Sequence, residues 1–568
     1  MFGLTVSFSL IALSFPVIAH AQTSLYLAYP PQEHSTVAES IFFIGTAPIE
    51  GEVLINDQVI NRSDAGHFAP SLPLQIGENK FTLRYQDQTI EITITRLATE
   101  AEIPSGVAFA DDSLTPKQDV SWLQNELICF SAIAPPDSQV SVEIADQIIS
   151  LLPQVNQKQL PPIRAVYYQG CTSFAEPGFL GYPLFKLSLD GETMTQSGSG
   201  KLTILAPHEL AVIEVKDDGG ITRTGAGTDY SRLTPLPAGA RATVTGRQGE
   251  WLRLDYGAWI KQEETRLIPH AVPTQSMIRT VKTNLQGEST EIIFPLETPI
   301  PLTVQQEDET LTVTLHNTVA QIDTIRFDDH PWLKRLDWQQ ISPNQVQYRV
   351  HFKSDQQWGY DLRYEQSNLI LTLKHPPQIP GGAILPLQGV SIVLDPGHGG
   401  PELGAKGPTG YPEKEINLLI SRLIERELIK RGATVYLTRE SDVELSLQDR
   451  VEMITRLNPA IALSIHYNAL PDGGDAENAA GISTFWYHPQ AHSLAVFIHN
   501  HLVDNLNRPD DGVYWNNLAL TRCHTVPTVL LELGFMINPV EFEWIIDPQE
   551  QTKLAAEIAE AIELWFRQ

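Results

Sequence analysis

The alternation of hydrophobic and polar residues separates a long N-terminal region with strand periodicity from a C-terminal region with a different pattern. Within residues 25–97, Ile90, Ile92 and Ile94 alternate with polar residues, as is typical of a strand with one buried and one exposed face. Residues 56–57, Asn-Asp, separate two short apolar runs and predict a hairpin turn. Repeated short strands of this kind predict a small β-sandwich.

Two further stretches also favour strands. A polar linker over 98–115 leads to residues 116–206, which are rich in β-forming sequence but match no fold that we can name. Residues 275–375 show regular alternation again and predict another β-domain. The sequence PPQIPGG then begins a predicted linker over 376–389, because proline and glycine interrupt regular elements.

The pattern changes over residues 390–568. A buried apolar strand over 390–395 is followed by a helix whose apolar residues recur every three or four positions from Ile416 to Leu428, and Gly432 ends that helix. Strands and helices continue to alternate to the end of the chain. This pattern predicts an α/β domain, with a mixed sheet flanked by helices, after the all-β modules.

Composition supports a multidomain globular protein. The chain has 568 residues, of which 42% are hydrophobic and 19% are charged, so about 150 residues per domain gives roughly four domains. The formal net charge is −29, and such a surface repels the phosphate backbone of nucleic acids. We therefore expect no nucleic-acid partner.

The first residues predict export. An apolar run ends in Ala19-His20-Ala21, the small-x-small pattern of a signal-peptidase site, so residues 1–21 are interpreted as a signal peptide. The run lacks a preceding Lys or Arg, and a membrane anchor is the alternative. Pro16 and the shortness of the run disfavour an anchor, and no later stretch reaches 18 uninterrupted apolar residues. We expect a protein without a stable transmembrane anchor.

The three cysteines exclude a disulfide-rich scaffold and a zinc module built from cysteines. Cys129 and Cys171 lie in one β-rich stretch, whereas Cys523 is far away in the sequence. An oxidising compartment would allow one bridge between the first two cysteines. Two buried free thiols are an equally good interpretation of the sequence.

Four residues of the α/β domain have the chemistry of a metal site. His398 follows the first strand, His466 ends an apolar strand, and Glu532 interrupts another, while Glu413 lies just ahead of the first helix. Open α/β sheets bind ligands at the carboxyl ends of their strands. Two imidazoles and one carboxylate suit a catalytic zinc ion, and a second carboxylate is needed to move the proton of the attacking water.

The same four residues divide into ligands and a base. A carboxylate on a buried strand is unfavourable without a partner or a task, so Glu532 is the better general base and Glu413 the better ligand. Taken singly, each residue also has a structural explanation. His398 would be a surface or capping residue, His466 a core histidine, Glu413 an acid at a helix start and Glu532 half of an ion pair.

Five blocks of the domain carry a family resemblance: LDPGHGG (394–400), EKEINL (413–418), TR (438–439), SIHYNA (464–469) and LELGFMIN (531–538). In this order they resemble the zinc-dependent N-acetylmuramoyl-L-alanine amidases of the type 3 family, over about 390–566. The resemblance implies one zinc ion held by His398, Glu413 and His466, with Glu532 as the catalytic residue. Some relatives carry a helical insert that blocks the site, and we expect no such plug between His466 and Glu532.

The resemblance also implies an activity and a location. Such an enzyme cleaves the amide between the lactyl group of N-acetylmuramic acid and L-alanine in peptidoglycan, in the periplasm or cell wall. Divisome or cell-envelope activator proteins are the partners we would expect besides the substrate.

Two upstream modules show weaker resemblances. GENKF at 77–81 looks like a loop of bacterial immunoglobulin-like domains. Residues 208–268 resemble a bacterial SH3-like domain through TRTGAG, LPAG, GEWLRL and a later Trp259-Ile260. In that module Trp251 and Trp259 are either core residues or part of a ligand groove. Such modules would position the enzyme on the wall.

Two other functions remain open at this point. The chain could be a wall-binding adaptor with an inactive amidase domain, or a zinc peptidase that cuts within the stem peptide. The intact set of four candidate residues favours the amidase over the adaptor. Digestion of purified peptidoglycan would separate the amidase from the peptidase.

Overall fold

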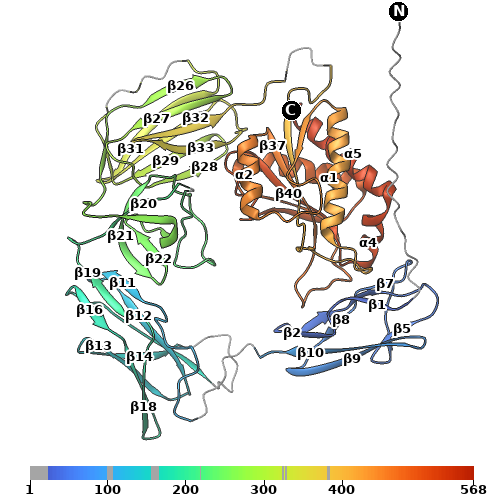
Figure 1. The fold of residues 1–568 in the computed structure, drawn as a ribbon, viewed down its shortest axis with the longest axis horizontal. Coiled ribbons are helices and arrows are strands. Elements are labelled where there is room, and N and C mark those ends of the chain that lie inside the picture. The colour runs from blue at the N-terminus through green and yellow to red at the C-terminus, as the bar shows by residue number, and fades with distance from the viewer. Residues whose placement is uncertain are drawn as a thin grey trace, which may run out of the picture.

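The computed structural model describes residues 24–98, 106–154, 165–217, 219–322, 325, 329–379 and 384–568. The predicted signal peptide over 1–21 lies outside this part of the chain. Figure 1 shows four β-domains and a C-terminal domain. The first β-domain lies beside the C-terminal domain, and the other three form a column on the left of the view. Among the described residues we find no helix that combines the length and hydropathy required to span a membrane.

The first β-domain (24–98) is built around a five-stranded sheet of order β2-β10-β9-β5-β6. Ile92 and Ile94 of β10 are buried, as their alternation predicts. Shorter pairings, β1-β4-β7 and β3-β8, cover the other side of a core that includes Phe43, Phe68 and Leu83. The strands are β1 (Tyr26–Tyr29), β2 (Glu33–Thr36), β3 (Ser40–Phe42), β4 (Ile44–Thr46), β5 (Val53–Ile55), β6 (Gln58–Val59), β7 (His67–Phe68), β8 (Ser71–Pro73), β9 (Gly77–Tyr85) and β10 (Gln88–Arg96).

The second β-domain (106–205) has a six-stranded sheet of order β12-β15-β14-β13-β17-β18. Cys129 and Cys171 lie opposite each other on β12 and β15 and form a disulfide, whereas Cys523 is free and buried. Phe109 and Leu114 pack in this core, so part of the predicted linker belongs to the domain. The strands are β11 (Val120–Leu123), β12 (Ile128–Ala134), β13 (Gln139–Ile144), β14 (Gln147–Gln154), β15 (Val166–Thr172), β16 (Gly178–Gly181), β17 (Leu184–Leu189), β18 (Glu192–Ser197) and β19 (Leu202–Leu205).

The third β-domain (206–268) shares a sheet with the second. Strand β11 pairs with β21, so one eight-stranded sheet crosses the domain boundary. Trp251 and Trp259 are each 6% exposed, which makes them core residues. The elements are β20 (Val212–Val215), β21 (Arg241–Gln248), β22 (Trp251–Leu254), β23 (Trp259–Lys261), the short 3-10 helix η1 (Gln262–Glu264) and β24 (Thr265–Ile268).

The fourth β-domain (275–375) consists of two four-stranded sheets, β26-β27-β34-β33 and β28-β29-β32-β31, with one shared core. Leu311, Val313 and Leu315 are buried in it. The strands are β25 (Ser276–Ile278), β26 (Lys282–Gln286), β27 (Ser289–Pro295), β28 (Leu302–Gln306), β29 (Thr310–His316), β30 (Thr318–Ala320), β31 (Leu333–Ser342), β32 (Gln345–Phe352), β33 (Tyr360–Glu365) and β34 (Asn368–Lys374).

The C-terminal domain (390–568) has a mixed sheet of order β36-β35-β37-β40-β38-β39. The first four strands in this order are parallel, whereas β38 runs antiparallel to β40. Apolar residues of α1, α3 and α5 pack on one face of the sheet, and α2 packs on the other. The strands are β35 (Ser391–Pro396), β36 (Thr434–Leu437), β37 (Ile461–Asn468), β38 (Ile482–Trp486), β39 (Asp510–Trp515) and β40 (Thr528–Phe535). The helices are α1 (Glu413–Lys430), α2 (Leu447–Leu457), the 3-10 helix η2 (Pro489–Ala491), α3 (His492–Leu506), α4 (Pro539–Ile546) and α5 (Pro548–Trp565).

At this level the predicted fold class is confirmed: mostly β structure, followed by an α/β domain with a mixed sheet and helices. The first helix begins at Glu413, three residues before Ile416, where its apolar pattern starts. Glu413 is therefore part of a helix and not of a loop. Helix α3 lies between His466 and Glu532 in the sequence, and its buried residues belong to the main core of the domain.

The first β-domain docks on the C-terminal domain. Phe42, Ile44 and Ala69 form an apolar cluster with Phe535 and Ile537. At the edge of this cluster, Tyr29 donates a hydrogen bond to Asp472, and His34 Nε2 lies 2.9 Å from the same carboxylate. Burial and the contact with Asp472 raise the pKa of Tyr29, so its hydroxyl stays protonated.

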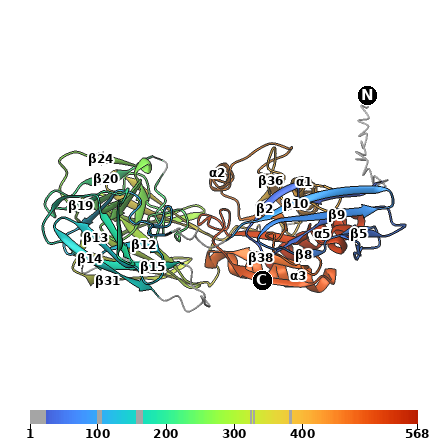
Figure 2. The same ribbon diagram turned by 90° about the horizontal axis from the view of Figure 1, so that it is seen from below.

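The fourth β-domain contacts both the C-terminal domain and the third β-domain. In the fourth β-domain, the ring of Trp358 lies 5.5 Å from that of Trp565 in α5. Thr234 of the third β-domain accepts a hydrogen bond from the Val304 amide of the fourth at 2.9 Å. The C-terminal domain therefore contacts β-domains on two sides, as Figures 1 and 2 show.

We predict that Ala69→Glu undocks the first β-domain. Ala69 is 1% exposed in the apolar cluster, and an unpaired carboxylate buried there costs several kcal/mol. Hydrogen exchange of amides in 470–480 should accelerate at least tenfold. Val59→Glu is the matched control, because Val59 is 58% exposed on the same domain and should leave exchange unchanged. Equal exchange in both variants would contradict this docking.

Candidate metal centre

Three of the candidate residues lie at one edge of the C-terminal sheet. Strands β35, β37 and β40 are parallel neighbours, so their carboxyl ends meet at that edge. His398 follows β35, while His466 on β37 lies directly opposite Glu532 on β40. Glu413 reaches the same edge as the first residue of α1.

The carboxylate of Glu413 lies between the two histidines. Its Oε2 is 3.1 Å from His398 Nε2, and its Oε1 is 3.0 Å from His466 Nδ1. The Glu413 side chain is 4% exposed, whereas those of His398 and His466 are 20% and 17% exposed. Burial works to raise the pKa of Glu413, but contacts with His398 and then His466 outweigh it and hold the pKa well below its usual range. The carboxylate is therefore ionised.

Backbone and side-chain donors hold this carboxylate in place. The register of β37 shifts between His466 and Asn468, and the Tyr467 amide donates to Glu413 Oε1 at 3.1 Å. Asn417 Nδ2 donates to the same oxygen at 3.0 Å, and the Ala405 amide donates to Oε2 at 2.9 Å. Glu413 is therefore a rigidly positioned acceptor.

The residues present fit a zinc ion. One ligand atom each from His398, Glu413 and His466 lie within 4.8 Å of one another. Two imidazoles and a carboxylate form a donor set that catalytic zinc sites use. Two glycines leave room for them: a Cβ on Gly397 would lie 2.1 Å from His466 Cε1, and one on Gly404 would lie 2.4 Å from Glu413 Oε2. Any larger residue would displace a donor.

His398 also has a partner on its outer side. Its Nδ1 lies 3.0 Å from Glu402 Oε1, which leaves Nε2 facing Glu413. A carboxylate in this position orients the imidazole of a metal ligand and raises its basicity. Nothing in the pattern of apolar residues marks Glu402, so sequence reasoning missed it.

Glu532 differs electrostatically from Glu413. Its Oε2 atom is buried and has no hydrogen-bond partner among the described residues. Burial raises the pKa of Glu532 to about 8; the charge of His466 opposes this rise and that of Glu413 adds to it. One carboxylate of the site is therefore held ionised while the other is poised to carry a proton, a division typical of catalytic acid–base groups.

A buried ion pair supports the loop that carries His398. Asp395 and Arg450 have side chains 1% and 3% exposed, and Arg450 Nη1 donates to Asp395 Oδ1 at 2.6 Å. Arg450 also donates to the carbonyl of His398 at 2.7 Å. His398 itself has φ 59°, a left-handed conformation that costs a non-glycine residue about 1 kcal/mol. The arginine stabilises this unusual turn.

The sequence also contains a signal for Arg450. Arg450 lies on the same helical face as Leu447, Val451 and Ile454, so a charge interrupts an otherwise apolar stripe. A charged residue at such a position is rarely buried without a partner. That partner is Asp395, which lies in the block around His398.

His524 lies away from this centre. It follows the chain reversal before β40, and its ring packs 4.9 Å from Tyr360 of the fourth β-domain. The carbonyl of His524 accepts a hydrogen bond from the Tyr360 amide at 2.9 Å. The residue therefore belongs to an interdomain contact and does not support the metal ligands.

The fold and the site together define an α/β domain with a candidate metal centre of the hydrolase type. Residues 392–564 match the family model described as N-acetylmuramoyl-L-alanine amidase, and this C-terminal domain belongs to that family. The match confirms the resemblance drawn from the five sequence blocks. The match begins only after the four β-domains, whose immunoglobulin-like and SH3-like resemblances are not confirmed.

Individual relatives match the same part of the chain. A stretch of 183 residues is 36% identical to the probable cell wall amidase LytH of Staphylococcus aureus. This stretch covers 32% of this chain and 60% of that protein. The chain thus spans about 60% of the length of this curated relative. Amidase AmiC2 of Nostoc punctiforme is 28% identical, with a TM-score of 0.30, and covers 32% of this chain and 98% of its own. The CwlD amidase of Clostridioides difficile, solved in complex with the GerS lipoprotein, is 27% identical, with a TM-score of 0.30, over 31% of this chain and 98% of its own.

We predict that Asp395→Asn destabilises the loop that carries His398. The substitution leaves the charge of Arg450 buried without its counter-charge, which lowers the free energy of unfolding by about 3 kcal/mol. Hydrogen exchange at 391–398 should accelerate, and thermal unfolding of the C-terminal domain should shift to lower temperature. Asp504→Asn, on the exposed side of α3, is the control. An unchanged unfolding temperature in Asp395→Asn would show that the pair does not support the loop.

Proposed function

We propose that the chain is a peptidoglycan hydrolase that cleaves the amide between N-acetylmuramic acid and L-alanine of the stem peptide. The family of the C-terminal domain supports this activity. The observation that carries the proposal is the convergence of four residues, far apart in the sequence, at one sheet edge. An inactive adaptor would have no need for this complete set.

In this proposal His398, Glu413 and His466 hold one zinc ion. When bound, zinc supplies Lewis-acid chemistry that polarises a carbonyl and makes water more acidic. Glu402 orients His398 through its Nδ1 atom, and Asn417 keeps the Glu413 carboxylate turned toward the histidines. The partial exposure of both histidines leaves an approach for substrate.

Glu532 carries the proton in the proposed reaction. Its unpartnered Oε2 takes a proton from the attacking water and delivers it to the nitrogen of the departing alanine. Water adds its oxygen to the lactyl carbonyl carbon, and the carbon–nitrogen bond breaks. The sugar leaves with a carboxylate and the peptide leaves with a free amine.

We also propose an exported protein that acts in the periplasm or cell wall. The disulfide between Cys129 and Cys171 supports an oxidising compartment. In this view the first β-domain is immunoglobulin-like, the third is SH3-like, and both position the enzyme on the wall. A divisome or cell-envelope activator is the protein partner that we expect, in addition to the substrate.

Two substitutions separate the roles of ligand and base. We expect His466→Ala to lose stoichiometric zinc and activity together. Glu532→Gln should retain zinc while amine release from purified peptidoglycan falls by about a thousandfold, because general-base catalysis contributes on the order of 10²–10⁴-fold. Zinc is measured by mass spectrometry of the purified full chain, and activity as new amino-terminal alanine.

The control is Asp504→Asn, a change at an exposed position on α3 that should leave both zinc and activity unchanged. Chelation should abolish amine release, and added zinc should restore it. No amine release by the zinc-loaded chain would favour the adaptor instead. Release of residues other than alanine would identify a peptidase and overturn the proposed cleavage site.

A further inference from the structure

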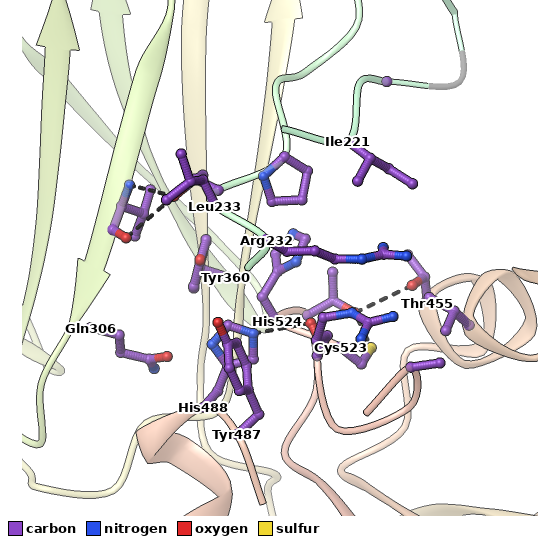
Figure 3. Close-up of a pocket in the computed structure, with 18 of the residues that line it drawn as sticks. Ile221, Arg232, Leu233, Gln306, Tyr360, Thr455, Tyr487, His488, Cys523 and His524 are labelled. Carbon is purple, nitrogen blue, oxygen red and sulfur yellow. Dashed lines mark hydrogen bonds between the residues drawn. The ribbon is translucent and has the colours of Figure 1, made fainter. Parts of the chain in front are cut away.

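A cavity of about 960 Å³ lies where the third and fourth β-domains meet the C-terminal domain. Figure 3 shows Arg232 and Leu233 from the third β-domain, Gln306 and Tyr360 from the fourth, and Tyr487, His488 and His524 from the C-terminal domain. Contributions from three domains make the cavity a property of their assembly. Its volume is sufficient for a ligand the size of one or two sugar rings.

The cavity is separate from the candidate metal centre. Strand β38 runs antiparallel to β40, and Ser483 near its start pairs with Glu532. Three residues later, Trp486 ends β38 toward the opposite edge of the sheet and lines the cavity. A ligand bound there would not occupy the reaction site.

The charge of the lining contrasts with that of the whole protein. The chain has 68 acidic and 39 basic residues, yet no Asp or Glu is among the described residues that line the cavity. Arg232 and Arg522 do line it, and neither forms an ion pair with a described carboxylate. Two unpaired guanidinium groups on one cavity favour an anionic ligand.

A third arginine strengthens the positive charge. Arg223 faces Arg232 in an isolated antiparallel bridge, and its Nε is buried without a hydrogen-bond partner. Burial and repulsion from Arg232 and Arg223 lower the pKa of Arg522 to about 10, so Arg522 stays charged at pH 7. Glu264 is the acid that most offsets Arg232, but it lies outside the lining and accepts a hydrogen bond from the Ile221 amide.

The two histidines add no charge. Burial lowers the pKa of His524 to about 4, and burial together with His524 lowers that of His488 to about 3. Both rings are therefore neutral at pH 7. The Nε2 of His488 lies 3.0 Å from the carbonyl of Arg522 and helps to position that residue.

Aromatic side chains form a platform in the same lining. The rings of Tyr487 and Trp515 stack with centroids 5.2 Å apart and planes inclined by 27°. Trp515 donates from its indole nitrogen to the Tyr487 carbonyl at 3.0 Å, which holds the pair together. Trp515 is 61% exposed, so a ligand in the cavity can reach its ring. Flat aromatic side chains beside fixed cations suit a sugar ring that has an apolar face and also carries a carboxylate.

We propose that this interdomain cavity binds a carboxylate-bearing saccharide, with the carboxylate between Arg232 and Arg522 and the sugar ring against Trp515 and Tyr487. The arginines supply paired donors for the anion, and the aromatic pair supplies the surface for the ring. The cavity is thus a second glycan site on the opposite edge of the sheet from the metal centre.

The proposed reaction produces such a saccharide. Hydrolysis of the lactyl amide places the oxygen of water on the carbonyl carbon and leaves a free carboxylate on N-acetylmuramic acid. The uncut sugar has an amide at that position. The cavity would therefore distinguish the glycan product from the substrate and retain the chain on strands already cut. This last step rests on the proposed function, whereas binding of the sugar does not.

The test compares two sugars on the full chain by titration calorimetry. N-acetylmuramic acid carries the lactyl carboxylate, and N-acetylglucosamine has the same ring without it. We expect only the acid to bind, and we expect binding to persist in His466→Ala, which disables the metal centre. Equal binding of both sugars, or binding of neither, would overturn the proposal. Displacement of the acid by equimolar inorganic phosphate would show a general anion site and would also overturn it.

Variants locate the binding. Arg232→Gln should weaken N-acetylmuramic acid binding by about tenfold, the effect of losing one charge-assisted contact. Trp515→Ala should weaken it too, whereas Arg279→Gln, an exposed arginine of the fourth β-domain, should not. Arg522 also donates a hydrogen bond to the Asn517 carbonyl, so its replacement removes a structural contact as well as a charge. Arg522→Lys keeps the positive charge and is the control for misfolding. Unchanged affinity in Arg232→Gln would exclude this cavity.

The two proposals fail separately. Amine release from peptidoglycan without binding of N-acetylmuramic acid would overturn only the second glycan site. Binding of the sugar without amine release would overturn only the hydrolase.

Discussion

The buried carboxylate of Asp395 is the constraint on which the candidate metal centre depends. It accepts hydrogen bonds from Thr438 after β36, from Ser464 on β37 and from Arg450 on α2. One side chain therefore ties three elements to the end of β35, immediately before His398. Burial works to raise the pKa of Asp395, but the charge of Arg450 and these hydrogen bonds hold it below its usual range. An ionised, fully paired group in this position makes the local geometry specific.

The pattern of apolar strands explains how much of the site can be predicted from the sequence. His398, His466 and Glu532 each follow or interrupt a recognisable apolar strand, and parallel strands bring such positions to one edge. Periodicity therefore predicts their places at strand ends, and the parallel pairing of β35, β37 and β40 brings them together. Apolar periodicity starts only at Ile416 and therefore predicts that Glu413 lies ahead of the helix, whereas hydrogen bonding begins the helix earlier. The partner Glu402 acts through a single hydrogen bond, which leaves no periodic signal in the chain, whereas Arg450 is marked in the sequence as a charge on the apolar face of α2.

The β-domains show a different limit of sequence reasoning. The alternation of apolar and polar residues predicts strands such as β10 well, because one face of the strand is buried and the other is exposed to solvent. It does not predict which strand pairs with which across a domain boundary. The pairing of β11 with β21 and the docking of Phe42 against Phe535 depend on surfaces contributed by residues far apart in the chain. Only tertiary packing determines such contacts.

The arrangement of domains gives the two edges of the C-terminal sheet different environments. The first β-domain contacts the loop after β37 through Tyr29 and Asp472, next to the edge that carries the metal ligands. The third and fourth β-domains instead enclose a positively charged cavity at the end of β38. Because β38 runs against the parallel strands, its end and theirs face opposite ways. The reversal of one strand thus places the candidate metal centre and the positively charged cavity at opposite edges of a single sheet, each beside different β-domains.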